Sequence, residues 1–182
     1  MSSHPVLRAT QKWIDEVVVG LGFCPFASAS IKAGGLRLEL CATTEVEDLC
    51  RLLVDELVFL QSQKGETYDS TLLVHPNLLS DFAVFNEFLG MCEDILAGLS
   101  LEGVFQIASF HPRYCFADAD ENDVGNYTNR SPYPMLHILR EASVTLAIAD
   151  YTDPAGIPEK NLQKLAALSV TEMQAMLQGC KD

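Results

Sequence analysis

Hydrophobic residues recur at intervals of three and four in several segments of the chain. These segments are residues 6–21, 46–60, 82–99 and 162–177. Such spacing is typical of helices that bury one face. It predicts three long helices and a C-terminal helical segment, and Ser169 and Thr171 favour a division of that last segment into two short helices.

Three shorter stretches have the character of strands. Residues 36–42 alternate Leu with Arg and Glu, which indicates a strand with one face in water. Residues 70–75 form a short apolar run. Residues 104–110 are apolar on both faces, which favours a central position in the sheet.

Two further helical segments are predicted near the middle of the chain. Ser131 and Pro132 form a typical helix start, so we expect a helix over residues 132–141 and another over 143–149.

The order of these elements sets the expected fold class. Full helices between strands act as crossover connections, which favour parallel pairing. We therefore predict a small α/β domain with three or four mostly parallel strands, and an α+β sheet of mixed direction is the alternative. Nothing resembles a linker, so residues 1–182 should form one domain, with 151–182 as a C-terminal helical extension that packs on it and carries no chemistry.

Composition narrows the classes of partner. The 182 residues are 48% hydrophobic, which is enough for a core, and carry a net charge of −13. Such an acidic protein repels nucleic acid and anionic membranes, and no apolar run approaches the roughly 18 residues of a membrane helix. We expect neither partner. The composition sets no oligomeric state.

Six cysteines are present, none of them in a C-x-x-C pair, which excludes a zinc ribbon and a thioredoxin-type site. No export signal is recognisable at the N-terminus, so we expect a cytoplasmic protein with reduced thiols.

Residues 103–140 hold most of the side chains able to do chemistry, and a long polar loop occupies the middle of this stretch. A His-Pro pair opens the loop at His111, and a second pair at His75 follows the preceding predicted strand. If these strands are parallel, both imidazoles emerge at the carboxyl edge of the sheet, where α/β proteins bind ligands. There His111 or His75 would act as a general acid or base.

The basic residues of this stretch suggest an anion site. Between Lys64 and Lys160 the only Lys or Arg residues are Arg113, Arg130 and Arg140. Guanidinium groups and the free N–H groups of a helix start both favour carboxylate or phosphate. The candidate ligand-binding residues are Arg113, Asn126, Asn129, Arg130, Ser131, His137 and Arg140. The alternative is that each arginine pairs with a nearby acid such as Glu141.

Three other functions stay open. A metal-dependent enzyme could hold zinc or iron with His75, His111 and His137, although no local ligand spacing supports it. A nucleophilic Cys24 or Cys115 could pair with His111, but a thiolate needs an electropositive neighbour and Cys24 has none nearby in sequence. A noncatalytic interaction domain is the third. The sequence identifies no cofactor.

The phrases GLGFCPFA, FQIASFHPRYCFAD and NYTNRSPYPMLHILRE resemble the bacterial and plant family catalogued as domain of unknown function 1415, and the resemblance covers most of the chain. It implies a soluble single-domain protein and assigns no activity or residue role. Our leading hypothesis is a small-molecule enzyme or binder for a carboxylate- or phosphate-bearing ligand.

Overall fold

A computed structural model describes residues 4–24, 26–27, 34–63, 67–149 and 153–182 of the protein. The elements in chain order are α1 (Pro5–Trp13), the π-helix η1 (Ile14–Val19), β1 (Leu36–Leu40), α3 (Val46–Gln63), β2 (Ser70–Val74), α4 (Phe82–Gly98), β3 (Phe105–Phe110), the 3-10 helix η2 (Val124–Thr128), β4 (Met135–Arg140), α5 (Glu141–Ala149), α6 (Ile157–Ala166) and α7 (Val170–Gly179).

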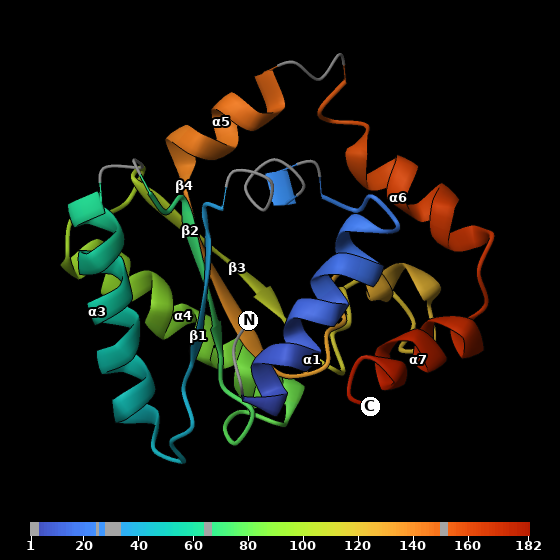
Figure 1. The fold of residues 1–182 in the computed structure, drawn as a ribbon, viewed down its shortest axis with the longest axis horizontal. Helices are drawn as coiled ribbons and strands as arrows, with labels where there is room; N and C mark the ends of the chain where they lie inside the picture. The colour runs from blue at the N-terminus through green and yellow to red at the C-terminus, as the bar shows by residue number, and fades with distance from the viewer. Residues whose placement is uncertain (1–3, 25, 28–33, 64–66, 150–152) are drawn as a thin grey trace.

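The four strands form one mixed sheet in the order β1-β2-β4-β3 (Figure 1). β1 and β2 are parallel, whereas β4 runs antiparallel to both of its neighbours, β2 and β3. An α/β or α+β class is therefore right, but the prediction of mostly parallel strands is wrong. The reason is that the fourth strand enters the sheet from the long loop, without a crossover helix.

This fourth strand replaces the helix predicted over residues 132–141. Met135–Arg140 pairs residue by residue with β2 and β3, so that His137 lies opposite Leu72 on one side and Ala108 on the other. Leu136 and Ile138 are buried on one face of the sheet and Met135 on the other. Burial on both faces explains why the apolar residues of β4 do not alternate with polar ones. The strand order places β3 at the edge of the sheet, where a central strand was predicted.

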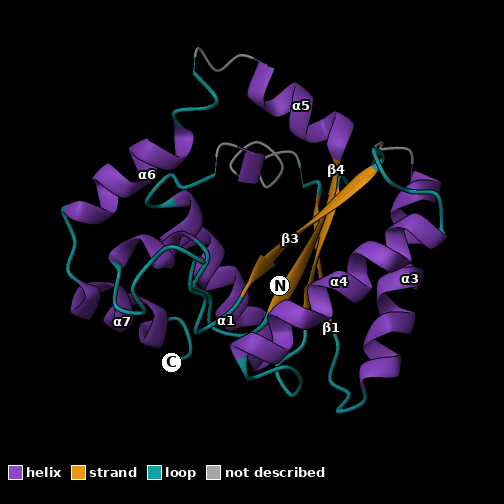
Figure 2. Cartoon of the chain, turned by 180° about the vertical axis from the view of Figure 1, so that it is seen from behind, coloured by secondary structure: helices purple, strands orange, loops and turns teal. Residues whose placement is uncertain are grey.

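Helices cover both faces of the sheet, which gives three layers (Figures 1 and 2). α3 and α4 enclose a first core with Leu73, Leu136 and Ile138 of the sheet. α1, η1, α6 and α7 enclose a second core on the opposite face, where Leu72 and Met135 meet them.

The first predicted helix is present but changes its winding part-way. Residues Ile14–Val19 form a π-helix, and the N–H of Gly20 donates to the carbonyl of Asp15 at 3.0 Å. A Cβ atom at Gly20 would lie 2.2 Å from the carbonyl oxygen of Glu16, so this position requires glycine. The wider turn buries Ile14, Val17 and Val18 together against the sheet.

The C-terminal segment forms two helices, as predicted. Ser169 caps α7 and exchanges two hydrogen bonds with Glu172. Leu165 of α6 and Met173 of α7 are fully buried in the second core. Among the helices of the described ranges, none has the length and apolar character that a membrane span requires.

Candidate functional site

The two His-Pro pairs lie at the same edge of the sheet. β2 and β3 both run antiparallel to β4, so they point in the same direction and end at the same edge. The rings of His75 and His111 both contact Phe85 of α4, with centroid distances of 5.8 and 5.1 Å. The expected juxtaposition is thus confirmed, although β4 separates the two strands.

Both imidazoles are fully buried and bound to the backbone. His111 donates from Nε2 to the carbonyl of Leu79 at 3.1 Å and accepts the N–H of Arg113 at Nδ1 at 3.0 Å, which fixes its tautomer. His75 places Nδ1 3.3 Å from the carbonyl of Leu78. Burial lowers the pKa of His75 to about 4 and also lowers the pKa of His111. His111 therefore braces two loops with both ring nitrogens engaged.

Two buried side chains order the long loop. Asn126 accepts the N–H of Phe116 at 3.0 Å and donates to the carbonyl of Asp120 at 2.8 Å. Arg130 is only 8% exposed and donates from Nε to the carbonyl of Tyr114 at 3.0 Å and from Nη2 to that of Glu121 at 2.6 Å. These bonds tie residues 114–121 to the segment that precedes β4.

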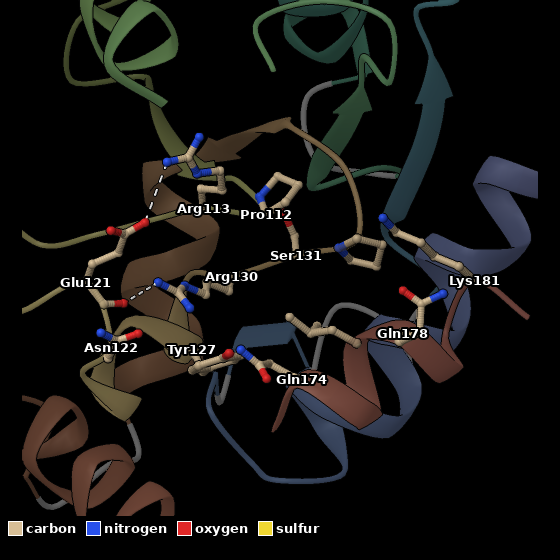
Figure 3. Close-up of a pocket in the computed structure, with 12 residues that line it drawn as sticks. Pro112, Arg113, Glu121, Asn122, Tyr127, Arg130, Ser131, Gln174, Gln178 and Lys181 are labelled. Carbon is tan, nitrogen blue, oxygen red and sulfur yellow. Dashed lines mark hydrogen bonds and ion pairs between the residues drawn. The ribbon is translucent and has the colours of Figure 1, made fainter. Parts of the chain in front are cut away.

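The loop and the C-terminal segment line an open pocket of about 460 Å³, which we call the loop–tail pocket (Figure 3). Its charged lining residues are Arg113, Glu121, Arg130 and Lys181. Its amide-bearing ones are Asn122 on the loop and Gln174 and Gln178 on α7. The predicted cationic residues Arg113 and Arg130 thus meet here, together with Ser131.

The guanidinium of Arg130 is held in place and retains donors for a ligand. Its Cζ atom lies 4.7 Å from the ring centroid of Tyr127. Only Nε and Nη2 bind carbonyl groups, and Nη1 makes no hydrogen bond to any residue that the structure describes. Arg113 is 65% exposed and lies 3.5 Å from the carboxylate of Glu121, which is a weak surface pair.

Parts of the predicted anion site are absent from this pocket. Because residues 135–140 form a strand, no helix begins at Pro132, and the helix N-terminus expected to bind the anion does not exist. Ser131 is buried and donates its hydroxyl to the carbonyl of Tyr133 at 2.6 Å. Arg140 lies on the face covered by α3, where its guanidinium donates to the carbonyl of Leu60 and stacks on Phe105.

Asn129 and the two candidate nucleophiles lie elsewhere around the loop. Asn129 donates to the carbonyl of Ser109 at 3.2 Å, and it lines a cleft together with Cys24. Cys115 lines a small hollow with Arg113, and its Sγ atom lies 3.5 Å from the carbonyl of Ala119. Burial raises the pKa of the Cys24 thiol, which favours the protonated form. Neither cysteine is among the hydrogen-bond partners of His111 in the described chain.

His137 is separated from the other two histidines. It lies on β4 and faces the second core, where its ring is near Phe26 and Phe110, at centroid distances of 6.4 and 6.3 Å. Within the described parts of the chain, no three His, Cys, Asp or Glu side chains are grouped so that they could hold a metal ion. The proposed ligand set of His75, His111 and His137 is therefore not assembled.

No local pattern in the sequence indicated the residues that α7 and the segment after it contribute to the pocket. Lys181, Gln174 and Gln178 line the loop–tail pocket, whereas the tail was expected to carry no chemistry. Their approach depends on tertiary packing, because Lys181 is some fifty positions away from Arg130 in the chain.

Comparison with known proteins places the chain in a family. The sequence pattern described as "Protein of unknown function (DUF1415)" matches residues 5–175. The chain belongs to this family. The part matched by DUF1415 contains Arg113 and Arg130, while Gln178 and Lys181 lie beyond it. No curated protein and no solved structure matches the chain.

Proposed function

We propose that the protein binds a small molecule bearing carboxylate or phosphate in the loop–tail pocket. The observation that carries this proposal is the position of Arg130: a buried, fixed guanidinium whose Nη1 group has no partner in the described chain and which lines a pocket of about 460 Å³. A guanidinium with unpartnered donors is suited to bind the oxygens of carboxylate or phosphate.

The charge of the pocket supports an anionic ligand. Arg113, Arg130 and Lys181 contribute three positive charges and Glu121 one negative charge, so 3 − 1 gives +2. The whole chain carries −13. A local excess of positive charge in so acidic a protein attracts small anions to this place and repels them elsewhere.

Arg130 also reduces the entropic cost of binding. Two carbonyl groups and the face of Tyr127 hold its side chain before any ligand arrives. A preorganised side chain loses little further freedom on binding, so more of the interaction energy appears as affinity. The amides of Gln174 and Gln178 supply neutral hydrogen-bonding groups for the rest of the ligand.

The function proposed for this pocket is binding, with no acid–base step by a histidine. His75 and His111 are absent from the lining of this pocket. His111 has both ring nitrogens bound to the backbone.

Isothermal titration calorimetry with phosphate, citrate and 3-phosphoglycerate tests the proposal. We expect at least one of the three to bind the wild type saturably, with one site per chain. Lys181→Gln and Arg113→Gln should each weaken that binding about tenfold, which corresponds to the loss of one charge-assisted hydrogen bond of roughly 1.5 kcal/mol.

Lys160→Gln provides the matched control. Lys160 is an exposed cation that pairs with Asp153 and does not line the pocket. The Lys160→Gln substitution changes the net charge of the chain by the same amount as the two pocket variants. Because Lys160 lies outside the pocket, this variant should bind the anion with wild-type affinity. Equal weakening by all three variants would mean that only the overall charge matters, and the absence of binding by every anion would also contradict the proposal.

A further inference from the structure

The positive charge of the loop–tail pocket is divided between its two walls. Figure 3 shows Arg113, Glu121 and Arg130 grouped on the side of the long loop, with Lys181 and Gln178 on the side of the C-terminal segment. The carboxylate of Glu121 lies 3.5 Å from the guanidinium of Arg113, so these two charges offset one another. The loop wall is therefore left with the charge of Arg130, and the tail wall carries the charge of Lys181.

The ammonium group of Lys181 is available to a ligand in the pocket. Lys181 is exposed, and its Nζ atom lies 5.0 Å from the ring centroid of Tyr133. It makes no ion pair with any residue that the structure describes. A cation on an aromatic face keeps both its charge and its N–H donors, so Lys181 can donate to an oxygen of an anion.

Two separate single charges favour a different anion from one double charge. A phosphate monoester concentrates up to about two negative charges on one group, whereas each wall supplies one net positive charge. A phosphate at the loop wall would also place its second charge near the carboxylate of Glu121, and like charges repel. Two carboxylates with one charge each match the two walls.

The remaining lining suits the chain that joins two carboxylates. Pro112, Pro132 and Leu177 contribute apolar surface to the pocket, and Gln174 and Gln178 contribute neutral amides. Methylene groups of a ligand are removed from water against such apolar surface, and the amides can bind hydroxyl or keto substituents. A volume of about 460 Å³ is sufficient for a molecule of this small size.

We propose that the loop–tail pocket binds a short dicarboxylate, with one carboxylate at Arg130 and the other at Lys181. This inference rests on the anion binding proposed above and narrows the ligand to a molecule with two separate carboxylates. Citrate belongs to this class, whereas inorganic phosphate can occupy only one wall.

Matched pairs of ligands distinguish one bound carboxylate from two. We would measure the affinities of succinate, glutarate, adipate and pimelate by isothermal titration calorimetry at neutral pH, where both carboxylates are ionised. Each diacid is compared with its monoamide, in which a neutral amide of the same shape replaces one carboxylate. At one chain length the diacid should bind about tenfold tighter than its monoamide, because only the diacid forms a charge-assisted hydrogen bond at each wall.

Two variants of the tail wall locate the second carboxylate. Lys181→Gln should lower the affinity for the diacid about tenfold and leave the affinity for the monoamide at the wild-type value. Gln178→Glu should have the same effect, because it places a negative charge on an exposed residue of the same wall. Lys160→Gln lies outside the pocket and is the control, so both affinities should stay unchanged.

Loss of the second contact is distinguishable from the absence of anion binding. Equal affinities of diacid and monoamide at every chain length, or a preference for the diacid that survives Lys181→Gln, would overturn the dicarboxylate and leave the binding of a single anionic group in place. Tighter binding of inorganic phosphate than of any diacid would have the same meaning. The absence of binding by every anion would contradict the proposed function itself.

Discussion

Arg130 has two roles that its surroundings make compatible. Its Nε and Nη2 atoms hold the carbonyls of Tyr114 and Glu121, and its remaining donors lie along a pocket. The same side chain therefore stabilises the long loop and contributes charge to the proposed anion site. This combination explains why an arginine is buried here in a position that makes no ion pair with any described residue.

We predict that Arg130→Ala lowers the free energy of unfolding by about 2 kcal/mol, because two carbonyl groups lose a charged donor. Urea denaturation measures this loss. Limited proteolysis should also begin between residues 114 and 121. Arg113→Ala is the control: its exposed ion pair contributes at most about 0.5 kcal/mol, so the stability should stay near that of the wild type. Equal stability of Arg130→Ala and the wild type would contradict the bracing role.

His75 should make the protein sensitive to acid. The pKa of its imidazole is about 4 in the folded chain and about 6.5 when unfolded. As pH falls from 6.5 toward 4, the unfolded chain gains a proton that the folded chain does not, so stability is lost across this window. At pH 5, the free energy of unfolding is lower by about 2 kcal/mol because of His75 alone.

His75→Asn tests this contribution, since an amide N–H can replace Nδ1 as the donor to Leu78. Urea denaturation at pH 7 and pH 5 gives the loss of stability for each protein. The wild type should lose about 2 kcal/mol more than the variant between these values. Parallel losses would mean that His75 accepts a proton in the folded state.

At the scale of elements, the sequence pattern predicted most helices and strands, but it predicted a helix where β4 forms. Helical spacing identified α1, α3, α4 and the two C-terminal helices because each buries one face. β4 is buried on both faces, so its apolar residues do not alternate with polar ones and carry no period that separates strand from helix. The Ser-Pro pair before it then favoured a helix start. Pairing with β2 and β3, which only the tertiary structure decides, overrides that signal.

Hydrogen exchange distinguishes the two arrangements. The amides of Met135–Arg140 should be among the slowest in the protein, because this strand has bonded neighbours on both sides. Alternate amides of β3 should exchange at least about tenfold faster, because one side of that strand is an open edge. Uniform protection of Phe105–Phe110 together with weak protection of β4 would contradict the observed strand order.

At the scale of the whole molecule, the C-terminal helices belong to the second core. Leu165 and Met173 are fully buried beside Trp13 and Val17. The tail therefore does more than cover a finished domain: α7 both completes a core and lines the loop–tail pocket.

We predict that Met173→Ala lowers the global free energy of unfolding by about 2–5 kcal/mol through loss of burial and creation of a cavity. Urea denaturation should give one transition with an unchanged slope, seen equally by far-ultraviolet circular dichroism and by Trp13 fluorescence. The solvent-exposed Gln174→Ala, on the same helix, is the control and should be nearly neutral. A variant that loses only part of its helix signal at low urea would show that the tail unfolds alone.

The candidate sites were predictable in part. The clustering of Arg113 and Arg130 in an acidic chain pointed to one wall of the loop–tail pocket, and the repeated His-Pro pair pointed to the correct edge of the sheet. The opposite wall of the loop–tail pocket came from residues remote in the chain, among them Lys181. No local pattern encodes such contacts, because packing of helices on a sheet creates them.

The central claim, that the loop–tail pocket binds an anion, is tested most directly by nuclear magnetic resonance of 15N-labelled arginine side chains during titration with the anion selected by calorimetry. We predict that the Nε–H signals of Arg113 and Arg130 shift together and saturate at one concentration. The signal of Arg51, an exposed arginine on α3, should stay in place. Unmoved signals of Arg113 and Arg130, or equal drift of all three, would contradict the account.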